Sequence, residues 1–583
     1  MKLSARTFKI QWDVHAWAGV ITSVFLFVVF YCGVFALYNA ELSRWQDPST
    51  HDAPARDPRS FGELLAELHR RIEIPDGARI ELNRGDETSA RVVHEPSDLD
   101  RQVSLSEPPD VTTADARASE PAGAISAGVP SPAPVLGAST LLTTQVREPD
   151  GDRDSSAANS GSLLTADPED HAEPEEPPED ADEDEDDNAH SRLAEELYVM
   201  HFFYRVPHGI EFAGVVAVAF FVALVSGLVI HLKDFKRQLW QFRPQLRVRF
   251  SSSDAHKVLG VFGLPFAAMY AWSGAVLGLF GLIGMPILYG VYTGDEAALG
   301  AERDLRAPEH VPAGHTAPMR PLDELVAQAT SLAAGSGKRP AEPLRLEIDG
   351  YRDAHAAVGV FFRRTLFASE AGFHFDAVSG ALVRRSGQVI APSEQVENVL
   401  FDLHYARFGG HMIKALYGLL ALAVCAVILT GNLIWVERRD AQRAQAGHRW
   451  LERLTVSISF GLIVGVAGYF VANRALPDGM TRRADLEFAL FLALWGASSL
   501  LALLPRLSPR SCAVWLSGAA AALFGLVSVT DALTQRVHLW NALARDNVPV
   551  FVAEVLIAAM AVAAGVLAWR LRRGSSTRQV ATR

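Results

Sequence analysis

Histidines at the ends of apolar segments carry the clearest chemical signal in this 583-residue chain. An imidazole in or beside a membrane span is costly unless it has a partner, so each such residue is a functional candidate. A neutral imidazole is also a common metal ligand. The candidate ligands are His15, His201, His208, His231, His256, His404 and His411.

Two of these histidines lie in copies of one motif. His15 and His256 both occupy the third position of the pattern D-x-H-x-x-x-G-V. In each copy another glycine, Gly33 or Gly274, follows 18 residues after the histidine. An internal repeat of this kind indicates that the two segments are structural copies.

A second repeat begins at His201 and His404. Each is followed seven residues later by another histidine, His208 or His411, and then by an apolar span that ends in Ser-Gly or Thr-Gly. The first half of the chain is therefore predicted to be two copies of helix, extracytoplasmic segment and helix. Both copies have the same membrane orientation, so the expected pseudo-twofold axis lies along the membrane normal.

Twofold pairing would bring equivalent histidines together near that axis. His15 and His256 are expected at one membrane face, and His201 and His404 at the other. Two imidazoles that face each other across a gap between helices suit bis-histidine ligation of haem. Zinc is less favoured, because the apolar spans contain neither a cysteine motif nor H-E-x-x-H.

Other histidines remain open as alternatives. His208 and His411 would lie about 20° from the same helix face as the first outer pair and about 10 Å along the axis, so they are rival outer ligands. His231 is a third candidate at the cytoplasmic face, although its counterpart in the second copy is Trp435.

The elements that position these residues are apolar segments long enough to cross a bilayer. A span needs about 20 mostly apolar residues. The expected spans are residues 15–38, 209–231, 257–282, 411–435, 454–473, 485–504, 512–530 and 548–570. The fold class predicted is a mainly α, polytopic bundle of about eight membrane helices, the first four an internal duplication.

Basic residues predict the orientation of this bundle. Lys and Arg cluster at the N-terminus, in residues 232–250 and 437–453, and in the C-terminal tail, with two arginines in the 475–484 loop as an exception. The expected location is a bacterial inner membrane, with both termini in the cytoplasm. Residues 39–200, 290–403 and 531–547 are then expected outside.

Both large outer segments contain helix and strand patterns, and each is interpreted as a small α+β module. A helix is expected at 321–335, and strands follow through 344–383 with a turn at 376–380. The first segment has a helix near 59–72 and strands near 78–94. The organisation predicted is a first span at 8–38, a periplasmic segment at 39–200, a second span with its cytoplasmic loop at 201–250, a third span at 251–289, a periplasmic domain at 290–403, a fourth span at 404–440, and four C-terminal helices at 441–583.

The net charge of −13 comes from one segment. Residues 167–188 hold 14 Asp or Glu and no Lys or Arg, so they are predicted to be a solvated spacer within a disordered insert at about 106–190. The cysteines lie inside apolar spans and form no disulfide framework. They are Cys32, Cys425 and Cys512.

The two histidine motifs, together with the strand-turn-strand stretch at 373–383, resemble the PepSY-associated transmembrane family over about residues 8–440. That family includes bacterial inner-membrane reductases that release iron from ferric siderophores by reduction of Fe(III) to Fe(II). The resemblance implies two haem b groups, with haem iron held by His15, His256, His201 and His404. The acidic insert and the four helices at 454–570 depart from the family pattern.

These observations predict a haem-dependent transmembrane oxidoreductase with a ferric siderophore as substrate and the lipid bilayer as its surroundings. No dinucleotide fingerprint is evident, so the electron donor would be a separate cytoplasmic protein, a quinone or a soluble flavin. No nucleic-acid partner is indicated. The alternatives are a non-catalytic PepSY membrane protein that binds or regulates a periplasmic partner, and a transporter. Transport is less favoured, because the spans contain almost no charged residues.

Overall fold

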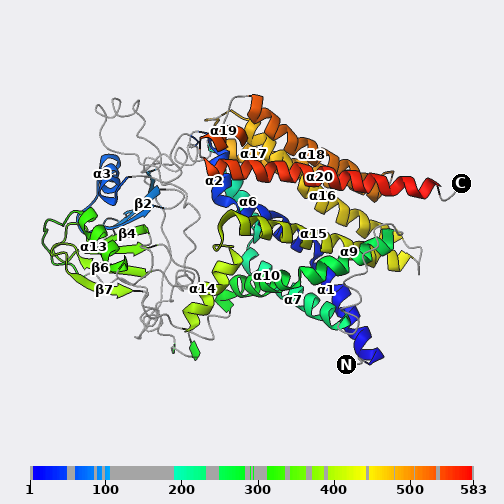
Figure 1. The fold of residues 1–583 in the computed structure, drawn as a ribbon, viewed down its shortest axis with the longest axis horizontal. Helices are drawn as coiled ribbons and strands as arrows, with labels where there is room; N and C mark the ends of the chain where they lie inside the picture. The colour runs from blue at the N-terminus through cyan, green and yellow to red at the C-terminus, as the bar shows by residue number, and fades with distance from the viewer. Residues whose placement is uncertain are drawn as a thin grey trace, which may run out of the picture.

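The structure is a computed structural model. It describes residues 4–48, 51, 59–84, 88–94, 97, 99–105, 190–231, 248–282, 289–290, 293, 311–334, 342–362, 371–386, 392–440, 446–477, 479–504, 506–533, 539–545 and 547–580. The acidic segment and nearly all of the predicted disordered insert lie outside these residues. Figure 1 shows a helical body and a smaller body that contains the sheet, with both chain termini at the end of the helical body far from the sheet.

The predicted bundle of membrane helices is confirmed. Among the described residues, seven helices are long and apolar enough to cross a membrane, or eight if one bent pair counts as a single span. The four spans of the duplicated half are α1 (Ala5–Ala36), α7 (Gly209–His231), the bent pair α9 (Val248–Phe262) and α10 (Leu264–Gly278), and α15 (Gly410–Asp440). Helix α1 contacts α7 and α15, and α7 contacts α10, so the copies interlock around one centre.

The third span differs from its copy in the first because it is broken. Helices α9 and α10 are bent by 67° at a break after Phe262, whereas α1 is continuous. Pro265 lies in the first turn of α10, and the equivalent position in α1 is Val24. Proline lacks an N–H and its ring clashes with the carbonyl four residues earlier, so a straight helix cannot continue through this point.

The two outer histidines end two short helices in the same way. They are the last residues of α6 (Leu193–His201) and α14 (Pro392–His404). In both, the N–H of the third residue after the histidine donates to the carbonyl of the second residue before it, with N···O distances of 3.1 Å. Phe203 and Ala406, two residues after each histidine, both have positive φ, as in a Schellman termination. The duplication therefore extends to the turn geometry.

The C-terminal helices pack onto the duplicated half through one continuous hydrophobic core. Helix α16 contacts α15 and α1, and α20 contacts α2, a short helix that follows α1. The elements are α2 (Asn39–Gln46), α16 (Ala446–Ala475), α17 (Arg483–Leu503), α18 (Pro509–Leu533), α19 (Leu539–Ala544) and α20 (Val548–Val580).

The two outer segments do not form separate sheets. Their strands join in one seven-stranded antiparallel sheet of order β3-β2-β1-β4-β5-β6-β7. The strands are β1 (Arg79–Arg84), β2 (Thr88–His94), β3 (Leu99–Ser104), β4 (Pro343–Asp349), β5 (Ala357–Phe362), β6 (Ala371–Asp376) and β7 (Leu382–Ser386). Strand β1 of the first segment pairs with β4 of the second, with Leu82 opposite Leu346.

One face of this sheet forms a hydrophobic core with two helices, α3 (Phe61–Arg71) and α13 (Leu322–Ala334). Alternate residues of the central strands, such as Ile80, Ile348 and Val358, are fully buried in it. The expected helices and the turn after β6 are present, with Asp376 accepting a backbone hydrogen bond from Ser379 at 2.6 Å. The modules predicted for the two segments are therefore two halves of one α+β domain.

Candidate functional site: two histidine pairs

The first pair lies between helices α1 and α9. The ring centroids of His15 and His256 are 6.1 Å apart, and the ring planes are inclined by 78°. His15 Nδ1 lies 2.8 Å from the carbonyl oxygen of Ala223 on α7, and His256 Nδ1 lies 2.9 Å from that of Val427 on α15. Each histidine is thus oriented by the other helix of its own copy and faces the histidine of the second copy.

The second pair joins the ends of α6 and α14. The ring centroids of His201 and His404 are also 6.1 Å apart, with the planes inclined by 55°. His201 Nδ1 lies 2.7 Å from the carbonyl oxygen of Val29 on α1, whereas His404 Nδ1 lies 2.8 Å from the Ser273 hydroxyl on α10. The pairing predicted from the repeat is therefore the pairing found in the structure.

Three of the four rings lie against a glycine. A Cβ atom built on Gly33 would lie 2.9 Å from His201 Cε1, one on Gly227 would lie 2.8 Å from His15 Cε1, and one on Gly431 would lie 3.0 Å from His256 Cε1. Each glycine follows four residues after the carbonyl that accepts from that histidine. Gly33 of the first motif and both span-end glycines, Gly227 and Gly431, thus each lie against an imidazole of a neighbouring helix.

These hydrogen bonds select the tautomer. A carbonyl oxygen can only accept, so Nδ1 of His15, His201 and His256 carries a proton, and in the neutral ring the lone pair is then on Nε2. For His404 and His201, which lie on helices outside the membrane spans, burial lowers the pKa below 6.5, and that of His404 to about 3, with the neighbouring His201 adding to the effect. Both rings are therefore neutral at pH 7, as a metal ligand must be.

The spacing of each pair fits one metal ion between two imidazoles. Two metal–nitrogen bonds of about 2 Å and two ring centre-to-nitrogen distances of about 1.1 Å give a centroid separation of roughly 6 Å. Within the part of the chain that the structure describes, no group of three or more His, Cys, Asp or Glu could hold a bare metal ion. Two imidazoles with no further protein ligand would suit haem, which supplies four nitrogen ligands of its own.

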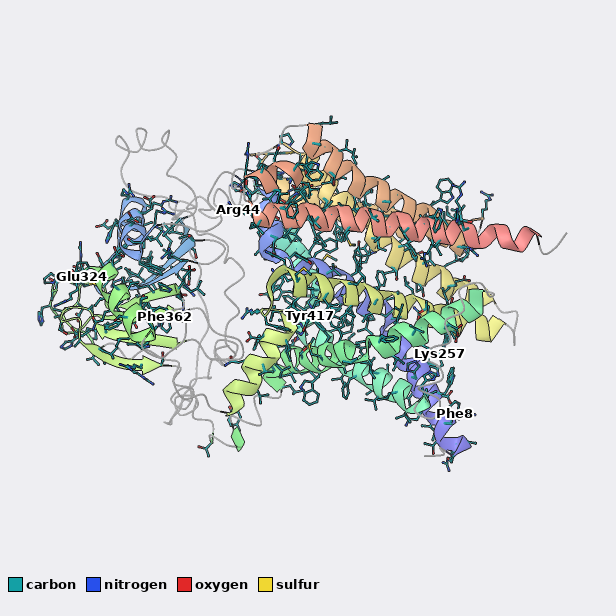
Figure 2. All side chains as sticks on the ribbon, viewed as in Figure 1. Phe8, Arg44, Lys257, Glu324, Phe362 and Tyr417 are labelled. Atoms are coloured by element: carbon teal, nitrogen blue, oxygen red, sulfur yellow. The ribbon has the colours of Figure 1, made fainter. Side chains whose placement is uncertain are left out.

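The two pairs are separated along α1. His15 belongs to one pair, and Val29, which orients His201 of the other pair, follows 14 residues later. At 1.5 Å per residue this is about 21 Å, most of the thickness of a membrane core. Figure 2 labels Lys257, next to His256, in the part of the bundle nearer the N-terminus, and Tyr417, whose ring packs on Tyr270 of the outer end, nearer the sheet.

The structure does not bring the rival outer ligands together. His208 is exposed in the turn before α7, with positive φ, and His411 is exposed in the first turn of α15, where its Nδ1 lies 3.2 Å from Glu41. The last cytoplasmic candidate, His231, ends α7 one turn beyond Gly227, which lies against His15. It lies close enough to His256 to interact with it electrostatically.

Sequence reasoning missed a group of charged residues buried in the C-terminal helices. Arg474 Nε lies 2.8 Å from Asp531, and both side chains are at most 2% exposed. Glu554 accepts a 2.7 Å hydrogen bond from the Trp45 indole, over which the Arg474 guanidinium lies at 3.5 Å. The available signal was the presence of an Asp and a Glu near the ends of otherwise apolar spans.

A known family model matches the duplicated half of the chain. Residues 12–438 match the model of the PepSY-associated TM region. The chain belongs to the PepSY-associated transmembrane family. This PepSY-associated protein is also 26% identical, over 298 residues, to an uncharacterized protein of Pseudomonas aeruginosa, a match that covers 49% of this chain and 73% of that protein. The family match includes both histidine pairs and the whole sheet, and it ends before α16.

Proposed function

We propose that this PepSY-associated protein is a haem-dependent oxidoreductase of the bacterial inner membrane. It would pass electrons from the cytoplasmic side to a periplasmic ferric siderophore. The observation that carries the proposal is the presence of two histidine pairs, each with ring centroids 6.1 Å apart, at the two ends of one bundle. His15 with His256 would hold one haem b, and His201 with His404 the other.

Haem would supply one-electron redox chemistry at each site. The chain's own part is to hold two rigid imidazoles with Nε2 unprotonated and to exclude water around them. Aromatic side chains support this near the outer pair, where Phe30 and Tyr270 pack at 6.2 Å and Tyr270 and His404 at 4.8 Å. The overall step adds one electron to a bound Fe(III) and yields Fe(II), which siderophores hold much less tightly.

The proposed orientation has both termini in the cytoplasm and the sheet in the periplasm. Basic residues gather at the N-terminus, in residues 232–250 and 437–453, and in the C-terminal tail, which are the segments that this orientation puts in the cytoplasm. A cysteine introduced at exposed Ser331 of α13 should react with an impermeant thiol reagent in spheroplasts. One at exposed Thr7 of α1 should react only after permeabilisation. The reverse pattern would overturn this orientation.

The haem spectrum of the purified full-length protein tests the assignment. We expect two low-spin b-type haems per chain in the reduced-minus-oxidised spectrum. His256→Ala should remove one site and His404→Ala the other, each with loss of about half the signal and of ferric-siderophore reduction in vesicles. His208→Ala is the control and should keep both haems. A wild-type protein without haem, or full haem content in both ligand variants, would refute the proposal.

A further inference from the structure

One of the four histidines is held by a different kind of group. His15, His201 and His256 each have Nδ1 within 2.9 Å of a backbone carbonyl. His404 has Nδ1 2.8 Å from the hydroxyl of Ser273 instead. That hydroxyl lies 2.8 Å from the carbonyl oxygen of Met269, to which it donates its single proton. Ser273 therefore accepts the N–H of His404.

The two copies differ at the positions that produce this exception. With the 241-residue spacing of His15 and His256, Val29 corresponds to Tyr270 and Cys32 to Ser273. In the first copy the carbonyl of Val29 accepts from His201. In the second, the Tyr270 hydroxyl donates to the carbonyl oxygen of His404 at 2.7 Å, and its ring lies beside that imidazole.

The contact between glycine and imidazole is also absent at Gly274, the counterpart of Gly33 in the second copy. A Cβ atom built on Gly274 would first meet the Cβ of Ala217, at 3.4 Å, and not an imidazole. His404 is thus displaced from the position over the glycine that the other three rings occupy. The serine hydroxyl fills the hydrogen-bonding role that the carbonyl has at those sites.

The kind of acceptor affects the ligand. A backbone carbonyl is a stronger hydrogen-bond acceptor than an aliphatic hydroxyl, so it draws the Nδ1 proton further and makes Nε2 a better electron donor. A better donor stabilises ferric over ferrous iron and lowers the reduction potential of a haem. The inner pair has two carbonyl-bound ligands, whereas the outer pair has one carbonyl-bound and one hydroxyl-bound ligand.

We propose that Ser273 is a positioning residue that sets the outer haem site at a higher reduction potential than the inner one. This inference rests on the proposed function, since it requires haem at both pairs. The asymmetry makes electron transfer from the cytoplasmic side to the periplasmic side downhill. With four identical ligand environments, hydrogen bonding to the imidazoles would not contribute to the direction of electron transfer.

Redox potentiometry of full-length variants with one site each tests the ordering. His15→Ala combined with His256→Ala keeps the outer pair alone, and His201→Ala combined with His404→Ala keeps the inner pair alone. The outer site should be the more easily reduced by about tenfold in the one-electron equilibrium constant, equivalent to about 59 mV. Equal potentials, or a higher potential at the inner site, would overturn the inference.

Substitution of the serine tests its cause. In the outer-site protein, Ser273→Ala should let His404 donate to the carbonyl of Tyr270, as its three counterparts do, and the potential should fall towards that of the inner site. The matched control is Cys32→Ser in the same protein, which leaves the Val29 carbonyl bound to His201 and should not change the potential. An unchanged or raised potential in Ser273→Ala contradicts the inference, whereas absence of haem from both parent proteins would refute the proposed function itself.

Discussion

The duplicated half and the C-terminal helices treat buried polar groups in opposite ways. In the duplicated half, each paired histidine has Nδ1 hydrogen bonded to a neighbouring helix. In the C-terminal helices the buried polar groups include charged side chains that form ion pairs. Arg474 pairs with Asp531 at 2.8 Å, and Arg483 pairs with Glu487 at 2.9 Å.

The two regions therefore differ in role. The paired histidines form a candidate ligand site, whereas the buried ion pairs hold the helices together. A buried cation and carboxylate are costly to separate, so such a pair favours one arrangement of the helices that carry it. The Arg474 guanidinium also lies 3.5 Å from the Trp45 ring, which belongs to α2, so the charged group ties the C-terminal helices to the duplicated half. The paired histidines, by contrast, each have a second ring nitrogen, which is the proposed metal ligand.

The largest effect is expected when a methyl group is added to a glycine that lies against a paired histidine ring. Gly227→Ala places a methyl group 2.8 Å from His15 Cε1, and the ring must move. We expect loss of the inner haem, about half of the low-spin absorbance. Gly19→Ala, on α1, meets nothing within 4 Å and is the matched control. Full haem content in the Gly227 variant would show that the ring does not depend on this glycine.

The next largest effect is expected at the buried charged group of Arg474, Asp531 and Glu554. Arg474→Met leaves Asp531 and Glu554 buried without their cation and should destabilise the protein by about 3–5 kcal/mol. The control is Arg482→Met, which breaks an exposed ion pair with Asp485 and should cost at most about 1 kcal/mol. Thermal unfolding in detergent measures both. The protein that remains folded should keep both haems. Loss of haem from folded Arg474→Met protein would contradict a purely structural role for this residue.

The proximity within each histidine pair could be predicted because duplication makes equivalence visible in a single chain. The repeated motifs and the expected membrane faces match His15 with His256 and His201 with His404. The exception at Ser273 could not be predicted, since it depends on how the break at Pro265 and the side chain of Tyr270 place α10 against α14. The joining of two segments into one sheet was hidden for a similar reason, because β1 and β4 are separated by more than 250 residues and pair only in three dimensions.

A smaller effect is expected at His374 on β6, where the stability of the sheet domain should depend on pH. Its side chain is 1% exposed, and burial lowers its pKa below 6.5. The unfolded chain then binds more protons than the folded one below about pH 6.5, so stability falls as the pH falls through that window. Hydrogen exchange of peptides from β5 and β6, corrected for intrinsic rates, should show weaker protection at pH 5 than at pH 7.5.

The variant His374→Gln keeps a polar side chain of similar length but does not titrate. Its loss of protection between pH 7.5 and pH 5 should be smaller than that of the wild type. Peptides from α1 are the internal reference, because they lie outside the sheet domain. An identical pH dependence in variant and wild type would assign the effect to other groups.

The smallest effect is expected at His411, where repeat spacing in the sequence is misleading. His208 and His411 both follow an outer histidine by seven residues, but they precede their span-end glycines, Gly227 and Gly431, by 19 and 20 residues. A shift of one residue turns a helical side chain by about 100°. The two residues are therefore not equivalent within their spans.

His411 instead contacts Glu41, which also binds Lys414 at 2.7 Å. In His411→Ala the carboxylate keeps its lysine, so the stability loss should be at most about 1 kcal/mol and the haem spectrum should not change. His404→Ala, seven residues earlier, should remove the outer haem under the same conditions. If His411→Ala bleached a haem while His404→Ala did not, the outer ligands would have to be reassigned and the division between ligand and structural groups redrawn.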